Sequence, residues 1–308
     1  DIMENIRRIG SYISTLRSKT ELYVLSVYPA NRPYRHEIAT LNGAIKAYSQ
    51  LAHCQYIDVY SKLKAPDGGI KSEFSNDGLH LTGKGYQVVA KALKPYLGRC
   101  AAKMLSDKMI SDVPHAYINQ RATLFANLPL KKHDILMFGG MDYNTAEWCE
   151  LTGNVHVKNR GVGVGTSSNL RLKEATLMVP HLLNGKKKPA KIYLSLGRED
   201  LLTHHQDADS VLVQYRQLVQ ILQQKSKRTT ICIQSLLPGE DATANLGTVV
   251  GFNKKLKELA QELHTEFVDV YPYFTNSDGT QRESYFREGW LKPDGFRLLA
   301  KVLFPQGR

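Results

Sequence analysis

An aspartate and a histidine three residues apart form a pair of side chains suited to acid–base chemistry. Asp77 and His80 lie in residues 76–86, which read Asn-Asp-Gly-Leu-His-Leu-Thr-Gly-Lys-Gly-Tyr. This spacing, on a loop that leads into a helix, lets the carboxylate and the imidazole lie side by side. Such a carboxylate can orient the imidazole and stabilise its protonated form, so that the histidine acts as a general base. The structural alternative is that His80 caps the following helix and Asp77 holds the turn.

Composition argues against several other classes of function. The chain has 308 residues, of which 42% are apolar and 23% charged, the balance of a globular protein. No apolar run approaches the roughly 20 residues of a membrane span. The net charge of +12 is scattered, and the densest basic cluster, residues 186–188, indicates a solvated loop because aromatic residues do not interleave with it. We therefore expect no nucleic-acid partner, although an acidic substrate or surface stays open.

The four cysteines give no reason to expect a metal site or a disulfide framework. None of them lies in a Cys-x-x-Cys pair. Cys232 falls in an apolar strand, where a buried small hydrophobic residue is expected. We predict no cofactor and no metal.

The sequence repeats itself at a nearly constant distance. Residues 20–29 match residues 229–238, and residues 56–60 match residues 267–271. Single-residue matches are Asn42 with Asn253, Gly85 with Gly295, Tyr86 with Phe296, Ala90 with Ala300 and Lys91 with Lys301. The offset stays between 209 and 211 residues, which predicts a duplicated domain and not a short solenoid repeat.

Each copy alternates helices with short apolar strands. Helical segments at residues 2–17 and 211–224 lead into a strand that ends in Ser-x-x-Pro, and a helix, a β-branched strand, a variable loop and a last helix follow. The second copy has two earlier strands, at residues 134–138 and 191–196. This order predicts βαβ units with a buried parallel sheet. The right-handed crossover rule then predicts an α/β fold, a doubly wound three-layer α/β/α domain.

The first copy lacks the counterpart of residues 133–209. It therefore has two strands where the second copy has at least four, too few for two helix layers to cover. We expect residues 1–100 to be the C-terminal part of a first domain, whose front half precedes Asp1 or comes from a separate partner chain. Residues 101–132 are predicted to be a connecting helical segment, and residues 133–308 a second, whole domain.

The order of elements and motifs resembles the SGNH (GDSL-like) hydrolase family, in particular its bacterial sialate O-acetylesterase-like and platelet-activating-factor-acetylhydrolase-like branch. Residues 117–129 resemble the lead-in helix of that branch. The resemblance implies a flavodoxin-like fold and a serine nucleophile after the first strand. It also implies a glycine and an asparagine that bind the oxyanion, and an Asp-x-x-His pair near the C-terminus. Asp77 and His80 match that last block, so the resemblance assigns them the catalytic carboxylate and base.

In the second copy, the same blocks have lost the residues that this chemistry uses. The replacements, in chain order, are Met141 for the serine, Val164 for the glycine, Glu199 for the asparagine, and Arg287 and Trp290 for the aspartate and histidine. Gly163 or Gly165 could stand in for Val164 if the loop shifts by one residue. A thioether cannot attack a carbonyl through a histidine base, a glutamate puts an acceptor where an oxyanion must bind, and an indole is no base.

We therefore expect the second copy to be a pseudoenzyme. Two carboxylate-based rescues are alternatives, one pairing Glu199 with Asp200 and the other pairing Asp142 with His156.

The resemblance thus predicts an esterase that hydrolyses small acyl esters, with an acetylated carbohydrate as the expected substrate. Asp77 and His80 would act with a serine, a glycine and an asparagine from outside this sequence. A lipid-directed acylhydrolase shares the chemistry and is an alternative. A periplasmic or secreted location follows from the resemblance alone.

The other alternative is a non-catalytic carbohydrate-binding or scaffold protein. The altered cleft of the second copy is expected to carry Trp290, Tyr143, Arg198, Glu199 and Arg287. An aromatic ring beside charged groups suits sugar binding. Equally, Trp290 could simply fill the volume that the triad left.

Overall fold

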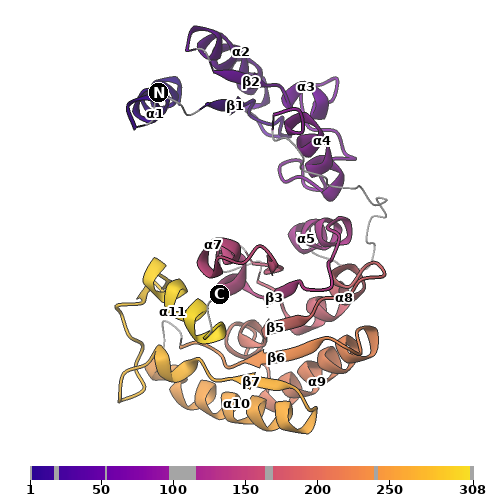
Figure 1. The fold of residues 1–308 in the computed structure, drawn as a ribbon, viewed down its shortest axis with the longest axis vertical. Coiled ribbons are helices and arrows are strands. Elements are labelled where there is room, and N and C mark those ends of the chain that lie inside the picture. The colour runs from indigo at the N-terminus through magenta and orange to yellow at the C-terminus, as the bar shows by residue number, and fades with distance from the viewer. Residues whose placement is uncertain are drawn as a thin grey trace. The chain divides into compact units, whose positions relative to one another are not determined.

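The chain divides into two compact units, residues 1–109 and residues 110–308 (Figure 1). The structure is a computed structural model that describes residues 2–16, 21–52, 54–96, 116–163, 169–238 and 242–305. Within these residues, no helix has the length and apolar character needed to cross a membrane.

The second unit is built on a five-stranded parallel sheet with the strand order β4-β3-β5-β6-β7. The strands are β3 (Ile135–Gly139), β4 (Val157–Asn159), β5 (Lys191–Ser195), β6 (Thr230–Gln234) and β7 (Glu266–Val268). In β3, β5 and β6, every residue after the first is buried. Such continuous burial is typical of a parallel sheet covered on both faces.

Helices cover both faces of this sheet. Leu136 and Phe138 of β3 pack into a core with α5 (Ala116–Asn127), α8 (Leu172–Leu182), α9 (Ala208–Lys225) and α10 (Ala242–Glu262). Met137, on the other face of the same strand, packs with α6 (Met141–Asn144), α7 (Trp148–Thr152) and α11 (Pro293–Leu303). The α/β fold with a parallel sheet between helix layers is thereby confirmed. The predicted strands 134–138 and 191–196 are β3 and β5, and β4 is the strand that the sequence prediction did not identify.

Two short elements of the second unit lie beside the strand ends. A five-residue π-helix, η1 (Glu199–Thr203), follows β5, and a 3-10 turn, η2 (Tyr271–Tyr273), follows β7. The strands β8 (Phe286–Arg287) and β9 (Trp290–Leu291) then form an antiparallel hairpin. Both turn residues, Glu288 and Gly289, have positive φ angles, 49° and 75°. This is the backbone of a tight two-residue hairpin, and it is unusual for a glutamate.

The first unit has two parallel strands, β1 (Tyr23–Leu25) and β2 (Gln55–Ile57), in the described residues. The helices are α1 (Ile2–Leu16), α2 (Arg35–Leu51), α3 (Tyr60–Leu63) and α4 (Gly83–Leu93). Its core gathers Ile57, Val59, Leu63, Ile70, Phe74, Leu81 and Val89. No described residue of this unit forms a counterpart of β3, β4 or β5.

The same hydrogen bonds occur at matched positions of the two units. The hydroxyl of Ser26 accepts bonds of 2.9 and 2.7 Å from the two backbone N–H groups that begin two residues after β2. The hydroxyl of Ser235 accepts bonds of 2.9 and 3.1 Å from the equivalent groups after β7. Asn42 bonds both the N–H and the C=O of Val27, and Asn253 bonds both those of Leu236. In each unit, these polar side chains therefore connect the segment after one strand to the adjacent helix and to the segment after the neighbouring strand.

The start of the last helix is also packed in the same way in both units. A Cβ added at Gly85 would lie 2.7 Å from the carbonyl oxygen of Phe74, and one added at Gly295 would lie 2.7 Å from that of Tyr285. Only glycine allows this approach, because a real Cβ does not come so close to a carbonyl oxygen.

Candidate functional site

Asp77 and His80 lie in contact on the loop before α4. The Nδ1 atom of His80 is 2.7 Å from the Oδ2 atom of Asp77, and the two side chains are 53% and 27% exposed. Gly78, between them, has a φ of +74°, a left-handed backbone conformation that glycine adopts without strain. The loop therefore brings together the two side chains that the sequence singled out.

The other oxygen of Asp77 is held by the loop itself. Oδ1 accepts bonds of 2.9 Å from the backbone N–H groups of Leu79 and His80, and one of 3.2 Å from the hydroxyl of Ser75. Burial raises the pKa of this carboxyl, but the bonds from His80 and Leu79 outweigh burial and hold the pKa well below its usual range. Asp77 is therefore ionised at neutral pH, and its charge faces the imidazole.

Capping of α4 is done by a different residue. The Oγ1 atom of Thr82 accepts a bond of 3.3 Å from the N–H of Gly85, which is the geometry of a helix N-cap. The alternative role of His80 as the cap is therefore wrong, because Thr82 holds that position. The alternative role of Asp77 is correct in part, since its carboxylate does hold the turn while it also contacts the imidazole.

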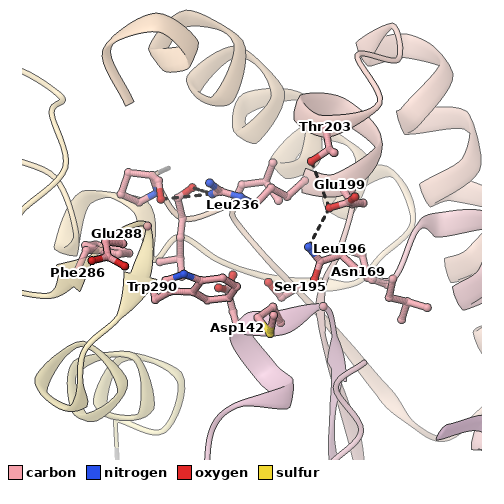
Figure 2. Close-up of a pocket in the computed structure, with 18 residues that line it drawn as sticks. Asp142, Asn169, Ser195, Leu196, Glu199, Thr203, Leu236, Phe286, Glu288 and Trp290 are labelled. Atoms are coloured by element: carbon pink, nitrogen blue, oxygen red, sulfur yellow. Dashed lines mark hydrogen bonds between the residues drawn. The ribbon is translucent and has the colours of Figure 1, made fainter. Parts of the chain in front are cut away.

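In the second unit, the carboxyl ends of β3, β5 and β6 open into a pocket of about 530 Å³ (Figure 2). It is lined by Gly140, Met141, Asp142, Asn169, Leu170, Ser195, Leu196, Gly197, Arg198, Glu199, Thr203, Leu236, Leu237, Pro238, Phe286, Glu288, Gly289 and Trp290. Ligands of doubly wound sheets bind at this edge, outside the carboxyl ends of the strands.

Met141, which the family resemblance aligns with the nucleophile, begins α6 one residue after β3 ends. Gly163 packs against it so closely that an added Cβ would lie 3.0 Å from the backbone nitrogen of Met141 and 2.6 Å from the Oδ1 atom of Asn169. Val164 and Gly165, the other two candidates for the oxyanion glycine, lie outside the described residues.

Glu199 occupies the far wall of the pocket as a hydrogen-bond acceptor. Its Oε2 atom accepts bonds from the Nδ2 atom of Asn169 at 3.1 Å and from the hydroxyl of Thr203 at 3.3 Å. Its side chain is 11% exposed. The position therefore presents carboxylate oxygens where the family resemblance leads us to expect an oxyanion donor.

The opposite wall comes from the hairpin β8–β9. Figure 2 shows Trp290 and Glu288 on one side of the pocket and Glu199 and Asn169 on the other, with Asp142 between them. Trp290 is 41% exposed. It therefore presents a ring to the pocket and is not merely a filler of volume.

Two residues expected in this cleft lie elsewhere. Tyr143 is fully buried, and its hydroxyl donates to the Oε1 atom of Gln234 at 2.7 Å, because α6 turns that side chain inward against Trp148. Arg287 is exposed and does not line the pocket, since it alternates along β8 with the buried Phe286 that does. The cleft therefore keeps Trp290, Arg198 and Glu199 and loses the other two.

Neither carboxylate-based rescue is assembled. The buried carboxylate of Asp200 accepts a bond of 3.0 Å from the N–H of Leu172, away from Glu199, and is not part of the pocket. His156 pairs with Asp134 at 3.0 Å, at the amino ends of β3 and β4, whereas Asp142 follows the carboxyl end of β3. No histidine lines the pocket among the residues that the structure describes.

Asn169, Ser195 and Glu288 are pocket residues that the sequence prediction missed. Ser195 ends β5, so its place at the strand end was a signal that could have been used. Glu288 lies in a turn with a positive φ, a conformation that the sequence gives no reason to expect of a glutamate. As for metals, the described ranges contain no group of three or more His, Cys, Asp or Glu side chains that could hold an ion.

Several solved structures are similar to this chain. A Streptococcus pneumoniae protein provisionally described as a platelet activating factor is 21% identical, with a TM-score of 0.54 over 62% of this chain and 93% of that one. A GDSL-like lipase from Bacteroides thetaiotaomicron is 14% identical, with a TM-score of 0.48 over 61% and 95%. An acetyl xylan esterase is 15% identical, with a TM-score of 0.44 over 56% and 98%. At 21% identity, the similarity to the Streptococcus pneumoniae protein concerns the fold alone. None of the curated proteins matches the chain.

The model of the GDSL-like lipase/acylhydrolase family matches residues 137–297, just over half of the chain. The match begins in β3, ends in α11 and therefore covers the unit with the altered pocket. Asp77 and His80 lie outside it. The chain belongs to the GDSL-like lipase/acylhydrolase family, the SGNH hydrolases.

Proposed function

We propose that this protein is a serine esterase of the SGNH type in which Asp77 and His80 form the acid–base half of the catalytic site. The observation that carries the proposal is the 2.7 Å contact between Oδ2 of Asp77 and Nδ1 of His80. The carboxylate is fixed by two backbone N–H groups and is ionised, which is what a residue that orients a histidine base requires.

In this mechanism, Nε2 of His80 takes the proton of a serine hydroxyl as the serine oxygen attacks the acyl carbonyl. Asp77 keeps the imidazole oriented and stabilises its positive charge. The proton then passes to the leaving alcohol, and the acyl group stays on the serine. Water, deprotonated by His80, attacks the acyl-serine and releases the carboxylic acid.

The serine and the oxyanion donors are proposed to come from a segment outside the 308 residues. The proposal rests on the correspondence between the two units. In the second unit, the nucleophile position follows β3 and the oxyanion position follows β5, and the described part of the first unit has neither strand.

We further propose that the two units are copies of one domain and that the second is a pseudoenzyme. The matched bonds of Ser26 and Ser235 and of Asn42 and Asn253 support the duplication. The loss of activity is supported by the pocket, where a thioether replaces the nucleophile and no described histidine offers a base.

The proposed substrate is a small acyl ester, with an O-acetyl group on a carbohydrate as the first choice. That choice rests on the resemblance of residues 117–129 to the sialate O-acetylesterase-like branch. A panel of p-nitrophenyl esters from acetyl to octanoyl, with acetylated sugars beside it, tests the chain-length preference. Rates that rise with acyl length would favour a lipid-directed enzyme instead.

Hydrolysis of p-nitrophenyl acetate by the natural full-length protein tests the catalytic assignment. His80→Ala is expected to lower kcat by about three orders of magnitude or more, because it removes the base. His36→Ala is the matched control, since His36 is an exposed histidine on α2 of the same unit. A full-length His80→Ala variant as active as the His36→Ala variant would refute the assignment.

A further inference from the structure

The pocket of the second unit is acidic in a chain that is strongly basic overall. Asp142, Glu199 and Glu288 line it, whereas the net charge of the whole chain is +12. Arg198 is the one basic residue among its described lining residues. A pocket with low-dielectric walls concentrates the field of such a charge set, and here the sign attracts cations.

The guanidinium group of Arg198 forms hydrogen bonds with the protein backbone. Its Nη1 atom donates to the carbonyl oxygens of Leu237 and Pro238 at 2.9 and 3.3 Å, just beyond the end of β6. The charge of Arg198 lowers the pKa of Asp142, but burial is the larger effect and raises it. Burial thus favours the neutral form of Asp142, and Oε1 of Glu199 lies 3.7 Å from Nε2 of His204. Glu288 is the exposed carboxylate of the three.

An aromatic ring stands beside these carboxylates. Trp290 is 41% exposed, and Figure 2 shows its indole reaching toward Asp142 across the floor of the pocket. A cation that lies over the face of a tryptophan is attracted by the ring quadrupole, and nearby carboxylates add to that attraction. Trp290 and Asp142 together thus suit a small organic cation better than an anion.

The remaining polar groups also favour a ligand that donates hydrogen bonds. The Oδ1 atom of Asn169 is buried, and it has no partner among the described residues. Its Nδ2 atom is already used by Glu199. A buried acceptor of this kind is normally satisfied by a donor, from water or from a ligand.

Glu288 adds an independent sign that the pocket surface has a use. The equivalent loop position of the first unit is Gly78, with a φ of +74°, and Glu288 adopts a φ of 49° at that place. A left-handed backbone is strained for a residue that carries a Cβ, because the Cβ approaches the following carbonyl oxygen. A residue with a strained backbone whose side chain lines a pocket points to a role in that pocket.

We propose that this pocket binds a small polar ligand with a protonated amine, an amino sugar being the class that best combines the cation, the donors and a ring that stacks on Trp290. The volume of about 530 Å³ lies within the roughly 300–1,000 Å³ of small-molecule sites. The proposal rests on the proposed non-catalytic state of the second unit and specifies what that unit recognises.

Binding is measured on the whole chain by tryptophan fluorescence and isothermal titration calorimetry. The probes are D-glucosamine, D-glucose and N-acetyl-D-glucosamine, which share the pyranose ring and differ in charge. Glucosamine is expected to bind at least tenfold more tightly than either neutral sugar. Trp148, the other tryptophan, is buried, so the fluorescence change is expected to disappear in Trp290→Phe.

Glu199→Gln is the charge test, because glutamine keeps an oxygen that can accept the bonds from Asn169 and Thr203. It is expected to weaken glucosamine binding about tenfold and to leave glucose binding unchanged. Glu258→Gln, at an exposed position of α10, is the matched control and is expected to change neither. Far-ultraviolet circular dichroism verifies that each variant is folded.

Equal binding of glucosamine and the neutral sugars overturns the proposal, as does the absence of binding by all three. A fluorescence change that persists in Trp290→Phe places the ligand elsewhere and also overturns it. His80→Ala separates this proposal from the esterase proposal. That variant is expected to lose hydrolysis in the full-length protein and to bind glucosamine like the wild type.

Discussion

The buried hydroxyl of Ser235 offers a sharp test of how the second unit is held together. Ser235 is fully buried, and its Oγ atom accepts two backbone N–H groups, at 2.9 and 3.1 Å, from the segment after β7. Ser235→Ala removes one oxygen, leaves the N–H of Val270 without that partner, and leaves the N–H of Tyr271 with only its 3.3 Å bond to Oδ1 of Asp269. A buried donor without a partner costs about 1–3 kcal/mol, so the variant is expected to lose about 1–3 kcal/mol of unfolding free energy.

Tryptophan fluorescence during urea unfolding is the appropriate assay. Both tryptophans of the chain, Trp148 and Trp290, lie in the second unit, so the signal follows that unit alone. In a thermal melt, the same loss lowers the midpoint by about 2–4 °C per kcal/mol for a unit of this size. Ser284→Ala, at an exposed serine, is the control and should move the transition by less than about 0.5 kcal/mol.

The matched residue in the first unit extends the test. Ser26 is 2% exposed and accepts bonds of 2.9 and 2.7 Å, so Ser26→Ala should destabilise the first unit by a similar amount. That change is expected in circular dichroism and not in fluorescence. A Ser235→Ala variant as stable as Ser284→Ala would refute the reasoning, because the N–H of Val270 would then find another partner at no cost.

Three further predictions concern charge, packing and chemistry. Because hydrogen bonds lower the pKa of Asp77, its ionised form stabilises the first unit at neutral pH, and that contribution is lost as the pH falls from about 4 toward the lowered pKa. The stability gap between wild type and Asp77→Asn, measured by urea unfolding, should therefore narrow below about pH 4; a constant gap would contradict this. Gly295→Ala should cost about 1–3 kcal/mol because its Cβ would meet the carbonyl oxygen of Tyr285, whereas Gly247→Ala, with nothing within 4 Å, should be neutral or slightly stabilising in the same unfolding assay. Met141→Ser should not raise hydrolysis of p-nitrophenyl acetate by the 308-residue chain, since no histidine is among the described residues that line the pocket and the amide of Asn169 already donates to Glu199; measurable turnover would show that Glu199 and Trp290 tolerate the chemistry.

The fold could be predicted from sequence because its signals are local. The apolar runs that became β3 and β5 are long, continuous and flanked by helices, so pattern and length agreed. β4 has only three residues, two of them polar, and such a strand carries no pattern of its own. Pairing with β3 creates it, through contacts that are distant in sequence.

The candidate site residues could be predicted where a motif fixes their spacing. They could not be predicted where packing decides which way a side chain points. The contact between Asp77 and His80 follows from a short loop, and so it was foreseen. The inward turn of Tyr143 depends on how α6 packs on Trp148, and the outward turn of Arg287 depends on which face of β8 is covered. Neither orientation can be predicted from the residue types alone.

Ser26 and Asn42 of the first unit make the same backbone hydrogen bonds as Ser235 and Asn253 of the second. The C-terminal part of each unit therefore holds its strand ends in the same way. If the two units are the copies that we propose, these segments are expected to be exchangeable. Replacing residues 230–303 by residues 21–93 would graft the Asp77–His80 loop into the place of the β8–β9 hairpin, over the pocket that now holds Met141 and Glu199. With serine and asparagine at those two positions, one recombined domain would carry together the nucleophile, the base and the carboxylate of the proposed mechanism.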